Sequence, residues 1–317
     1  MGEIAVALAN WNGMKYLERC LESVFAQTCA PREVVIVDNG STDGSAEWIA
    51  DRYDQVHLLL NETNEGFAAG YNKAIAACSQ PFVLILNTDV FLAPDFIEVT
   101  LAALAEYPEA GAATGSVFQQ GTGEWLNSGF FLRPQMRTEH SANLDRAEAV
   151  FGCSGALILF RREMLEDIRI EGQYFDEAYF SYGEDIDLAW RAQLLGWQAR
   201  FTPGAKAHHV GSGSSDERLS FVDKPAFLQR HLLKNRYLTL VKNTSMGVLP
   251  YVLLPFILAE PLVWLYLLLR LPWRFPYLLL ALADTCRHLP TALRWRRQLM
   301  RRQRVSAAYI RQFLRRV

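Results

Sequence analysis

Short apolar runs alternate with amphipathic helical segments through the first third of the chain, and this alternation constrains the fold more than any other feature. The runs are rich in Val, Ile and Leu, as buried parallel strands are, and occupy residues 3–9, 33–37, 56–61 and 82–87. Helical periodicity fills residues 15–27 and 68–78 between them. The order predicts an α/β fold with a mostly parallel sheet, helices on both faces and ligands at the carboxyl ends of the strands.

The rest of the chain carries weaker signals. Pro94 suits the first position of a helix that an apolar stripe then continues. Residues 152–165 are typical of a strand that enters a helix, and residues 185–197 of an amphipathic helix whose first turn is acidic. Gly, Ser, Thr and Asn predict a looser region at 111–143 and a flexible loop at 205–216.

Length and cysteine content set broad limits. A chain of 317 residues has room for one large domain or two of ordinary size. The five cysteines are odd in number and contain no CxxC pair, so they predict neither a disulfide framework nor a zinc finger, and a reducing cytosol is expected. The first residues lack a basic segment followed by a long apolar run, and no signal peptide is expected.

Charge is strongly segregated along the chain. The net charge is −2, but the segment from Arg287 to the end holds ten arginines and no acid, which leaves −12 for residues 1–286. Such a tail suits either nucleic acid or an anionic membrane surface. Residues 248–269 before it contain one charge, Glu260, so the membrane is favoured and a basic RNA-binding arm is the alternative.

The apolar segment at 248–283 contains prolines, and Glu260 would be costly at the middle of a bilayer. Paired helices that lie in or dip into the interface are therefore predicted in preference to one straight span. The prolines expected to break the segment are Pro255, Pro261, Pro272 and Pro276.

Polar side chains gather where the predicted strands end. Asp38 ends one strand and is placed to accept from the ring N–H of a uracil or thymine base, although any strand-to-helix turn favours such a residue. Asn87 and Asp89 stand two residues apart, on one face, and suit a hard cation such as Mg²⁺ or Mn²⁺. A solvated turn is the alternative. Small residues at 66–70 would let a backbone approach a bulky ligand.

Five acids from Asp176 to Asp187 stand among aromatic residues. A partly desolvated site of this kind would raise the pKa of a carboxylate and suit it to act as a general base. For Asp187 a helix-terminal role or a contact with Arg191 is preferred. His208 and His209, which follow this segment, make a metal or phosphate role plausible.

Taken together and in order, these segments resemble the inverting family 2 glycosyltransferases with the GT-A fold, in their rhamnosyltransferase-like branch. The resemblance covers roughly residues 3–215 and rests on NWNG at 10–13, VDNGSTDGS, NEGFAAGYN, LNTDV, GCSGA, YGEDIDLAWR and HHVGSGS. The DxD metal motif of the family here reads Asn87-Thr88-Asp89, as in the NxD form of that branch.

The resemblance implies a role for each candidate residue. The catalytic base belongs to the Glu184-Asp185 pair, with Asp185 as the base and Glu184 holding the acceptor or orienting the base. Nucleotide contacts are implied for Asn10, Asp38, Asn64, Gly70, Asn72 and Lys73. A divalent cation, Mg²⁺ or Mn²⁺, is implied at Asp89, with Asn87 weaker and His208 within reach of the metal or diphosphate.

The expected organisation is a GT-A catalytic domain at 1–215, a linker or helical extension at 216–247 and a membrane-associating region at 248–317. The expected reaction moves a sugar, best rhamnose from dTDP-rhamnose, or a UDP-linked sugar, to a lipid-linked or polysaccharide acceptor at the cytoplasmic face of the membrane, without nucleic acid. The alternatives are a nucleotidyltransferase and an inert transferase-like scaffold. The first would want a GxG-type loop near the N-terminus, and the second is opposed by intact Asp38, Asp89 and Asp185.

Overall fold

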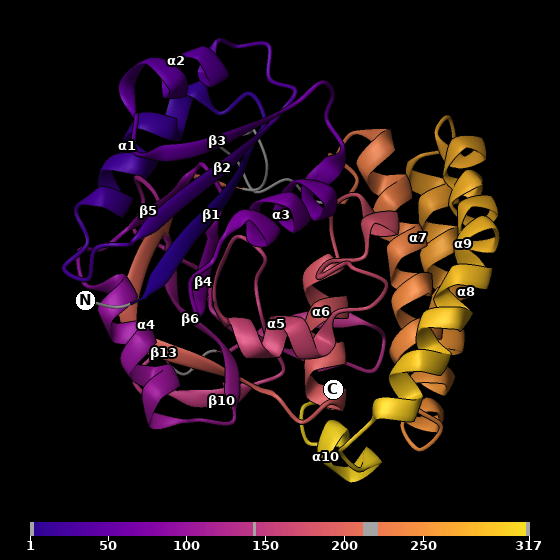
Figure 1. Ribbon diagram of the computed structural model, residues 1–317. Helices are drawn as coiled ribbons and strands as arrows, with labels where there is room; N and C mark the ends of the chain where they lie inside the picture. The colour runs from indigo at the N-terminus through magenta and orange to yellow at the C-terminus, as the bar shows by residue number, and fades with distance from the viewer. Residues whose placement is uncertain (1–2, 142–143, 212–220, 315–317) are drawn as a thin grey trace.

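The computed structural model describes residues 3–141, 144–211 and 221–314, and Figure 1 shows a twisted sheet flanked by helices beside a layer of long C-terminal helices. The first part contains β1 (Ile4–Asn10), α1 (Met14–Phe25), β2 (Glu33–Asn39), α2 (Ser45–Arg52), β3 (Val56–Asn61), α3 (Gly66–Ala77), β4 (Phe82–Leu86), β5 (Val90–Leu92) and α4 (Phe96–Glu106). The middle part contains β6 (Ala110–Gln119), β7 (Trp125–Asn127), β8 (Gly129–Arg133), β9 (Arg137–His140), β10 (Glu148–Val150), β11 (Gly152–Cys153), β12 (Leu157–Arg161), α5 (Arg162–Ile168), the short 3₁₀ helix η1 (Glu177–Tyr179), α6 (Glu184–Leu194) and β13 (Gln198–His209). The last part contains α7 (Ala226–Asn243), α8 (Leu249–Arg270), α9 (Phe275–Arg302) and α10 (Ala307–Arg311).

The main sheet is mixed in direction. Strands β4, β1, β2 and β3 run parallel in that order, as the alternation predicted. Strand β12 then runs antiparallel between β4 and β6, while β13 pairs parallel with β6. The fold is α/β as expected, but antiparallel pairs make the sheet less parallel than the sequence predicted.

The region at 111–143, expected to be loose, is largely strand. Ala110–Gln119 form β6 and β8 pairs with β9 in a small second sheet. The small residues of β6 are there because a neighbouring strand passes closely: a Cβ at Gly115 would lie 2.1 Å from the Ala205 carbonyl oxygen. Glycine and alanine therefore mark close strand packing here, not a loop.

The predicted loop at 205–216 also begins as strand. Residues 205–209 complete β13, where alternate side chains are buried, and His208 and His209 pair with Phe91 and Val90 of β5. Residues 212–216 of that prediction lie outside the described residues.

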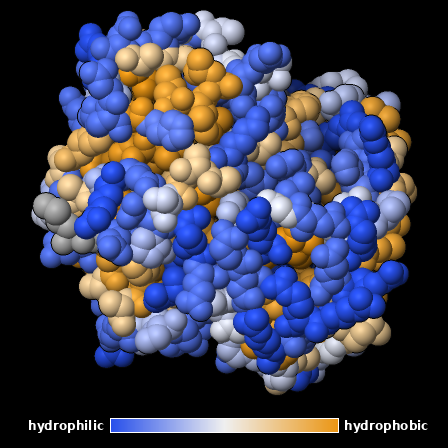
Figure 2. All heavy atoms as spheres, in the orientation of Figure 1, coloured by the Kyte–Doolittle hydropathy of each residue, from blue (hydrophilic) through white to orange (hydrophobic). Residues whose placement is uncertain are grey.

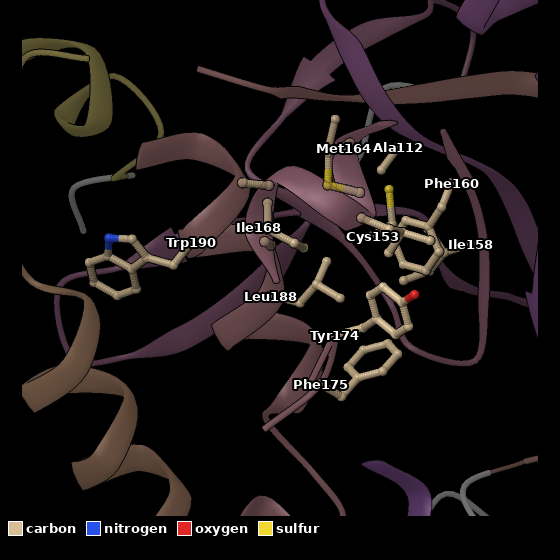
Figure 3. Close-up of a cluster of buried hydrophobic side chains, with 14 of the residues drawn as sticks. Ala112, Cys153, Ile158, Phe160, Met164, Ile168, Tyr174, Phe175, Leu188 and Trp190 are labelled. Carbon is tan, nitrogen blue, oxygen red and sulfur yellow. The ribbon is translucent and has the colours of Figure 1, made fainter. Parts of the chain in front are cut away.

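Both faces of the sheet are buried, as the continuous apolar runs require. In β1, Ile4, Val6 and Leu8 join one hydrophobic cluster, and Ala5 and Ala7 join the other. Figure 3 shows part of the second cluster, where side chains of β12, α5 and α6 pack together. This packing fixes α6, the helix that begins with the predicted carboxylate pair, against the sheet.

The C-terminal helices form a layer beside the sheet domain (Figure 1). The segment expected as a linker is mostly α7, which packs along α9 and touches α6. The expected breaks at Pro255 and Pro261 do not occur, because α8 continues through both prolines. The chain turns at residues 271–274, which include Pro272, and Pro276 lies in the first turn of α9.

The end of the chain contributes to the main hydrophobic core. Trp295, Leu299, Ile310 and Phe313 are buried in the same cluster as the sheet and α6. Three tail arginines pair with acids of the sheet domain: Arg294 with Glu171, and Arg302 and Arg304 with Asp167. The charge pattern had suggested a tail that faces lipid along its whole length. Instead, part of the tail packs against the sheet domain.

Candidate active site

A cleft of about 420 Å³ opens at the carboxyl ends of β1 and β4, the edge where ligands were expected. Four of the candidate residues line it: Asn87, Asp89, Glu184 and Asp185. The structure thus brings together side chains that lie almost a hundred residues apart in the chain.

The wall that follows β4 carries Asn87, Asp89 and His209. Asn87 Oδ1 lies 3.3 Å from the Tyr71 hydroxyl, and Asp89 Oδ1 lies 3.2 Å from His209 Nε2. His209 is buried and lines the cleft, whereas its neighbour His208 is exposed beside the Phe118 ring. The histidine at this wall is therefore His209, whereas His208, the residue implied by the resemblance, does not line the cleft.

The carboxylate pair at the start of α6 also lines the cleft. Asp185 Oδ2 accepts from the Gly155 N–H at 3.0 Å, and its Oδ1 accepts from the Ile186 N–H at 2.8 Å. Burial raises the pKa of Asp185, although these backbone donors oppose the rise. Burial, and then the nearby Asp185 charge, also raise the pKa of Glu184, whose Oε2 is buried without a hydrogen-bond partner.

Asn10 and Asp38 form a buried pair behind the cleft. Asp38 accepts from Asn10 Nδ2 at 2.7 Å and from the Ser41 N–H at 2.9 Å, and is 3% exposed. Asn10 Nδ2 also lies 2.8 Å from the Ser45 hydroxyl. Both side chains thus hold the turn after β2, and a nucleobase could reach Asp38 only at its remaining lone pairs.

Asn64 and Gly70 shape the turn into α3 and its packing. Asn64 Oδ1 accepts from Asn39 Nδ2 at 3.1 Å and from the Gly66 N–H at 2.8 Å. A Cβ at Gly70 would lie 3.1 Å from the Ala9 Cβ, so glycine lets α3 approach β1.

Asn72 and Lys73, which were expected to contact the nucleotide, bond to other parts of the protein. Asn72 Oδ1 accepts from the N–H groups of Tyr174 and Phe175, and its Nδ2 donates to the Phe175 carbonyl at 2.8 Å. Lys73 Nζ lies 2.7 Å from Glu65 Oε2 at the surface. Asn72 therefore supports the segment leading to the carboxylate pair, and Lys73 makes a surface ion pair.

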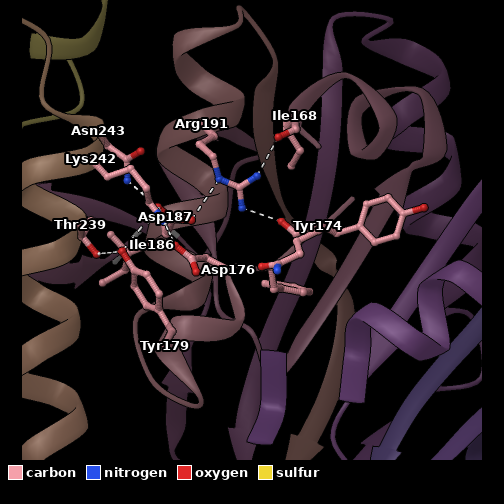
Figure 4. A network of polar contacts seen from close by, with 12 residues as sticks. Ile168, Tyr174, Asp176, Tyr179, Ile186, Asp187, Arg191, Thr239, Lys242 and Asn243 are labelled. Atoms are coloured by element: carbon pink, nitrogen blue, oxygen red, sulfur yellow. Dashed lines mark hydrogen bonds and ion pairs between the residues drawn. The ribbon is translucent and has the colours of Figure 1, made fainter. Parts of the chain in front are cut away.

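A buried ionic network lies one turn further along α6 (Figure 4), and sequence patterns predicted only its Asp187–Arg191 part. Lys242 of α7 is fully buried, lies 2.9 Å from Asp187 Oδ1 and also pairs with Asp176. Burial alone would raise the pKa of Asp187, but Lys242 and Arg191 outweigh it and hold that pKa below its ordinary value.

Replacing Lys242 with methionine should destabilise the folded chain by about 3–5 kcal/mol, because two buried carboxylates lose their shared cation. Urea unfolding measures the loss. The exposed lysine of β13 provides the control: Lys206→Met should change the unfolding free energy by less than about 0.5 kcal/mol. Equal effects of the two substitutions would contradict the assignment of Lys242 to a buried network.

The described residues contain no group of three or more His, Cys, Asp or Glu side chains arranged to hold a metal ion. Asp89, Asn87 and His209 nevertheless present oxygen and nitrogen donors to one wall of the cleft. Such a partial donor set fits a divalent cation whose other ligands come from a diphosphate and water.

A mixed α/β sheet with acidic and polar side chains gathered in a cleft at its strand ends is the arrangement of a GT-A glycosyltransferase. The sequence model of glycosyl transferase family 2 matches residues 5–169, more than half of the chain, so the chain belongs to this family. The family expected from the motifs is thereby confirmed.

Two relatives show the range of the family. The chain is 29% identical over 242 residues to N-acetylglucosaminyl-diphospho-decaprenol L-rhamnosyltransferase of Mycobacterium tuberculosis, covering 66% of this chain and 78% of the relative. It is 25% identical over 211 residues to poly-beta-1,6-N-acetyl-D-glucosamine synthase of Staphylococcus epidermidis, covering 64% of this chain and 48% of the relative.

Solved structures show the same fold. GalNAc-T7 with UDP, GalNAc and Mn²⁺ matches 76% of this chain and 48% of its own, with a TM-score of 0.60 and 17% identity. S. aureus TarS 1-349 in complex with UDP matches 94% of this chain and 92% of its own, with a TM-score of 0.55 and 18% identity. Since both identities are low, these likenesses establish the GT-A fold alone.

Proposed function

We propose that this glycosyltransferase is an inverting enzyme that moves a sugar from a nucleoside-diphosphate donor to a hydroxyl of a lipid-linked or growing polysaccharide acceptor. Rhamnose from dTDP-rhamnose is the best candidate donor, supported by the mycobacterial rhamnosyltransferase relative. The observation that carries the proposal is that Glu184, Asp185, Asn87 and Asp89 all line one cleft.

The two groups of side chains suit the two ends of an inverting displacement: Asn87 and Asp89 the leaving diphosphate, and the Glu184-Asp185 pair the acceptor hydroxyl. The acceptor hydroxyl attacks the sugar on the face opposite the leaving diphosphate, and a base must take its proton. Asp185 fills that role, because the Gly155 and Ile186 N–H groups hold its carboxylate in place and its raised pKa makes it a better proton acceptor. Glu184, beside it, orients the acceptor or the base.

A thermal-shift screen tests donor recognition. A nucleotide that binds only the folded chain raises the melting temperature, so dTDP, UDP and GDP should separate by their effects, with dTDP giving the largest shift. The screen is run with and without Mn²⁺. A melting temperature that none of the three nucleotides raises above that of the free chain would contradict a nucleotide-sugar site.

Asp89, Asn87 and His209 are the residues proposed to hold Mg²⁺ or Mn²⁺. The bound cation would neutralise charge that develops on the leaving diphosphate. His209 takes the place of His208 in this proposal because the His209 side chain lies beside Asp89.

Asp89→Ala and His209→Ala should each weaken cation-dependent binding of the nucleoside diphosphate, and Asn87→Asp should tighten it by adding a charged ligand. Calorimetry with and without EDTA measures the effect. His208→Ala is the matched control, since His208 is exposed on the next position of the same strand. If EDTA changes neither binding nor turnover, the cation site is wrong.

The outer face of α8 is the proposed membrane contact. Among the described residues α8 alone has the length and composition to cross a membrane, with a mean hydropathy of 2.2 over its best window, and only 17% of that window is buried. Figure 2 shows apolar residues reaching the surface at the edge of the molecule where α8 and α9 lie. The exposed leucines recur every three or four residues, at Leu254, Leu258, Leu262, Leu265 and Leu269.

The opposite face of α8 is tied to α7. Glu260 pairs with Arg236 at 2.5 Å, and Trp264 donates to the Tyr237 hydroxyl at 2.8 Å. These contacts favour a helix that lies in the interface over one that spans the bilayer. The exposed Arg287, Arg297 and Arg301 of α9 would meet anionic headgroups, and the enzyme would work at the cytoplasmic face of the membrane.

The double variant Leu258→Ser with Leu262→Ser should reduce partition into anionic vesicles by about 10²-fold or more, because each buried leucine contributes about 1.5–3 kcal/mol. Sedimentation with liposomes measures it. Leu60→Ser, at a leucine of β3 that is equally exposed, is the control and should bind as the wild type does. Unchanged partition of the double variant would place the membrane contact elsewhere.

A further inference from the structure

Helix α7 supports the segment 176–187, which carries the carboxylate pair, through polar side chains spaced along one of its faces. Lys234 Nζ contacts the Ala178 carbonyl, and the Thr239 hydroxyl lies 2.7 Å from the Tyr179 hydroxyl. Asn243 Nδ2 donates to Asp187 Oδ1 at 2.7 Å. These side chains are buried, so they serve contacts inside the molecule.

Asn235 makes the most concentrated of these contacts. Its Nδ2 lies 2.9 Å from the Tyr179 carbonyl, 2.9 Å from the Ser181 carbonyl and 2.7 Å from the Tyr182 carbonyl. One amide group, 1% exposed, thus gathers three carbonyl oxygens of a single tight segment.

The backbone of that segment needs such support. Phe180 and Tyr182 have φ values of 63° and 69°, in the left-handed region that bulky residues rarely adopt, and Gly183 follows with 85°. Gly183 is also the residue from which α6 begins, so the conformation of 180–183 determines where the Glu184 and Asp185 side chains point. A conformation this unfavourable persists only where its surroundings hold it.

We infer that Asn235 is a positioning residue for the catalytic carboxylates: its amide holds the strained turn 179–183 so that Glu184 and Asp185 face the cleft. The inference rests on the proposed function and deepens it, because it makes α7, which lies beyond the region matched by the family model, a part of the catalytic apparatus. Asn235 itself does not contact the cleft lining except through this turn.

Asn235→Ala should lower kcat by about 10- to 100-fold, since small misplacements of a reacting group are costly, while the KM for the nucleotide-sugar donor stays within about twofold. This substitution does not alter Asn87 or Asp89, the proposed contacts of the donor. Asn235→Ser, whose hydroxyl can still donate to one carbonyl, should recover part of the lost kcat.

Gln229→Ala is the matched control. Gln229 is another buried amide of α7, and it donates to the carbonyls of Phe221 and Val222, away from the catalytic turn. It should lower the melting temperature to a similar extent and leave kcat within about twofold. The inference is overturned if the two alanine variants lose kcat equally, if the donor KM rises in step with the loss of kcat, or if Asn235→Ser is no better than Asn235→Ala.

Hydrogen exchange separates this inference from the proposed function. Asn235→Ala should speed amide exchange across 178–187 without changing exchange in β1 and β4, and this readout needs no reaction. A wild-type protein that transfers no sugar would refute the proposed function, whereas unchanged exchange at 178–187 would refute the positioning role.

Discussion

Replacing Asp185 with asparagine is expected to lower the rate of sugar transfer by about 10²–10⁴-fold, the contribution of a well-placed general base. Asparagine keeps the shape of the side chain and can still accept from the Gly155 or Ile186 N–H, but it cannot accept the proton of the acceptor hydroxyl. Affinity for the nucleoside diphosphate should hardly change, because the proposed donor contacts are Asn87 and Asp89, which this substitution leaves intact.

Steady-state transfer assays and calorimetry on Asp185→Asn measure the two quantities separately, and Glu184→Gln is the companion variant. A smaller loss is expected for Glu184→Gln, because Glu184 orients the reaction but does not take the proton. Wild-type transfer by Asp185→Asn together with a large loss in Glu184→Gln would move the base to Glu184.

Ending the chain after Gly247 should leave a protein that is unfolded or aggregated. The charge pattern had suggested a separable membrane module at 248–317, whose removal would leave a soluble nucleotide-binding domain. In the structure, this segment supplies buried side chains to the main core: Val248, Val252, Phe256, Trp295, Leu299, Ile310 and Phe313. At about 1.5–3 kcal/mol for each buried apolar side chain, the loss exceeds the stability of most domains.

Circular dichroism and size-exclusion chromatography of the truncated chain test this expectation. The matched comparison is the Leu258→Ser, Leu262→Ser double variant, which removes the exposed apolar stripe and leaves the core intact, and which should be folded. A monomeric, cooperatively folding truncated chain that binds nucleotide would restore the separable module.

Local patterns predicted the parallel half of the sheet because its strands are buried on both faces and appear as continuous apolar runs. They did not predict β6, since its Ala and Gly residues resemble a loop when the close approach of Ala205 is unknown. The strand character of residues 205–209 was missed for the same reason.

The candidate site was predictable where its residues follow strand ends and helix starts. Asn87, Asp89, Glu184 and Asp185 reach the cleft as expected. The choice between His208 and His209 depended on which face of β13 is buried. The pairing of β13 with β5 determines that face, and no local sequence pattern reveals this pairing.

The polar face of α7 was not predictable at all from local sequence. Lys242 and Asn235 stand in an ordinary helical pattern, and their partners lie more than fifty residues earlier in the chain. Only the folded chain shows that these side chains are buried against the segment that carries Glu184 and Asp185, the proposed catalytic pair.

The most direct test of the account is the anomeric configuration of the product. The full-length protein, in anionic vesicles containing a polyprenyl-diphosphate-linked sugar, is given labelled dTDP-rhamnose and a divalent cation, and the glycosidic linkage formed is assigned by NMR. We expect one product whose anomeric configuration is opposite to that of the donor. A product that retains the donor's configuration would contradict the inverting mechanism. Absence of transfer from dTDP-rhamnose and from the UDP-linked sugars tested beside it would contradict the proposed function.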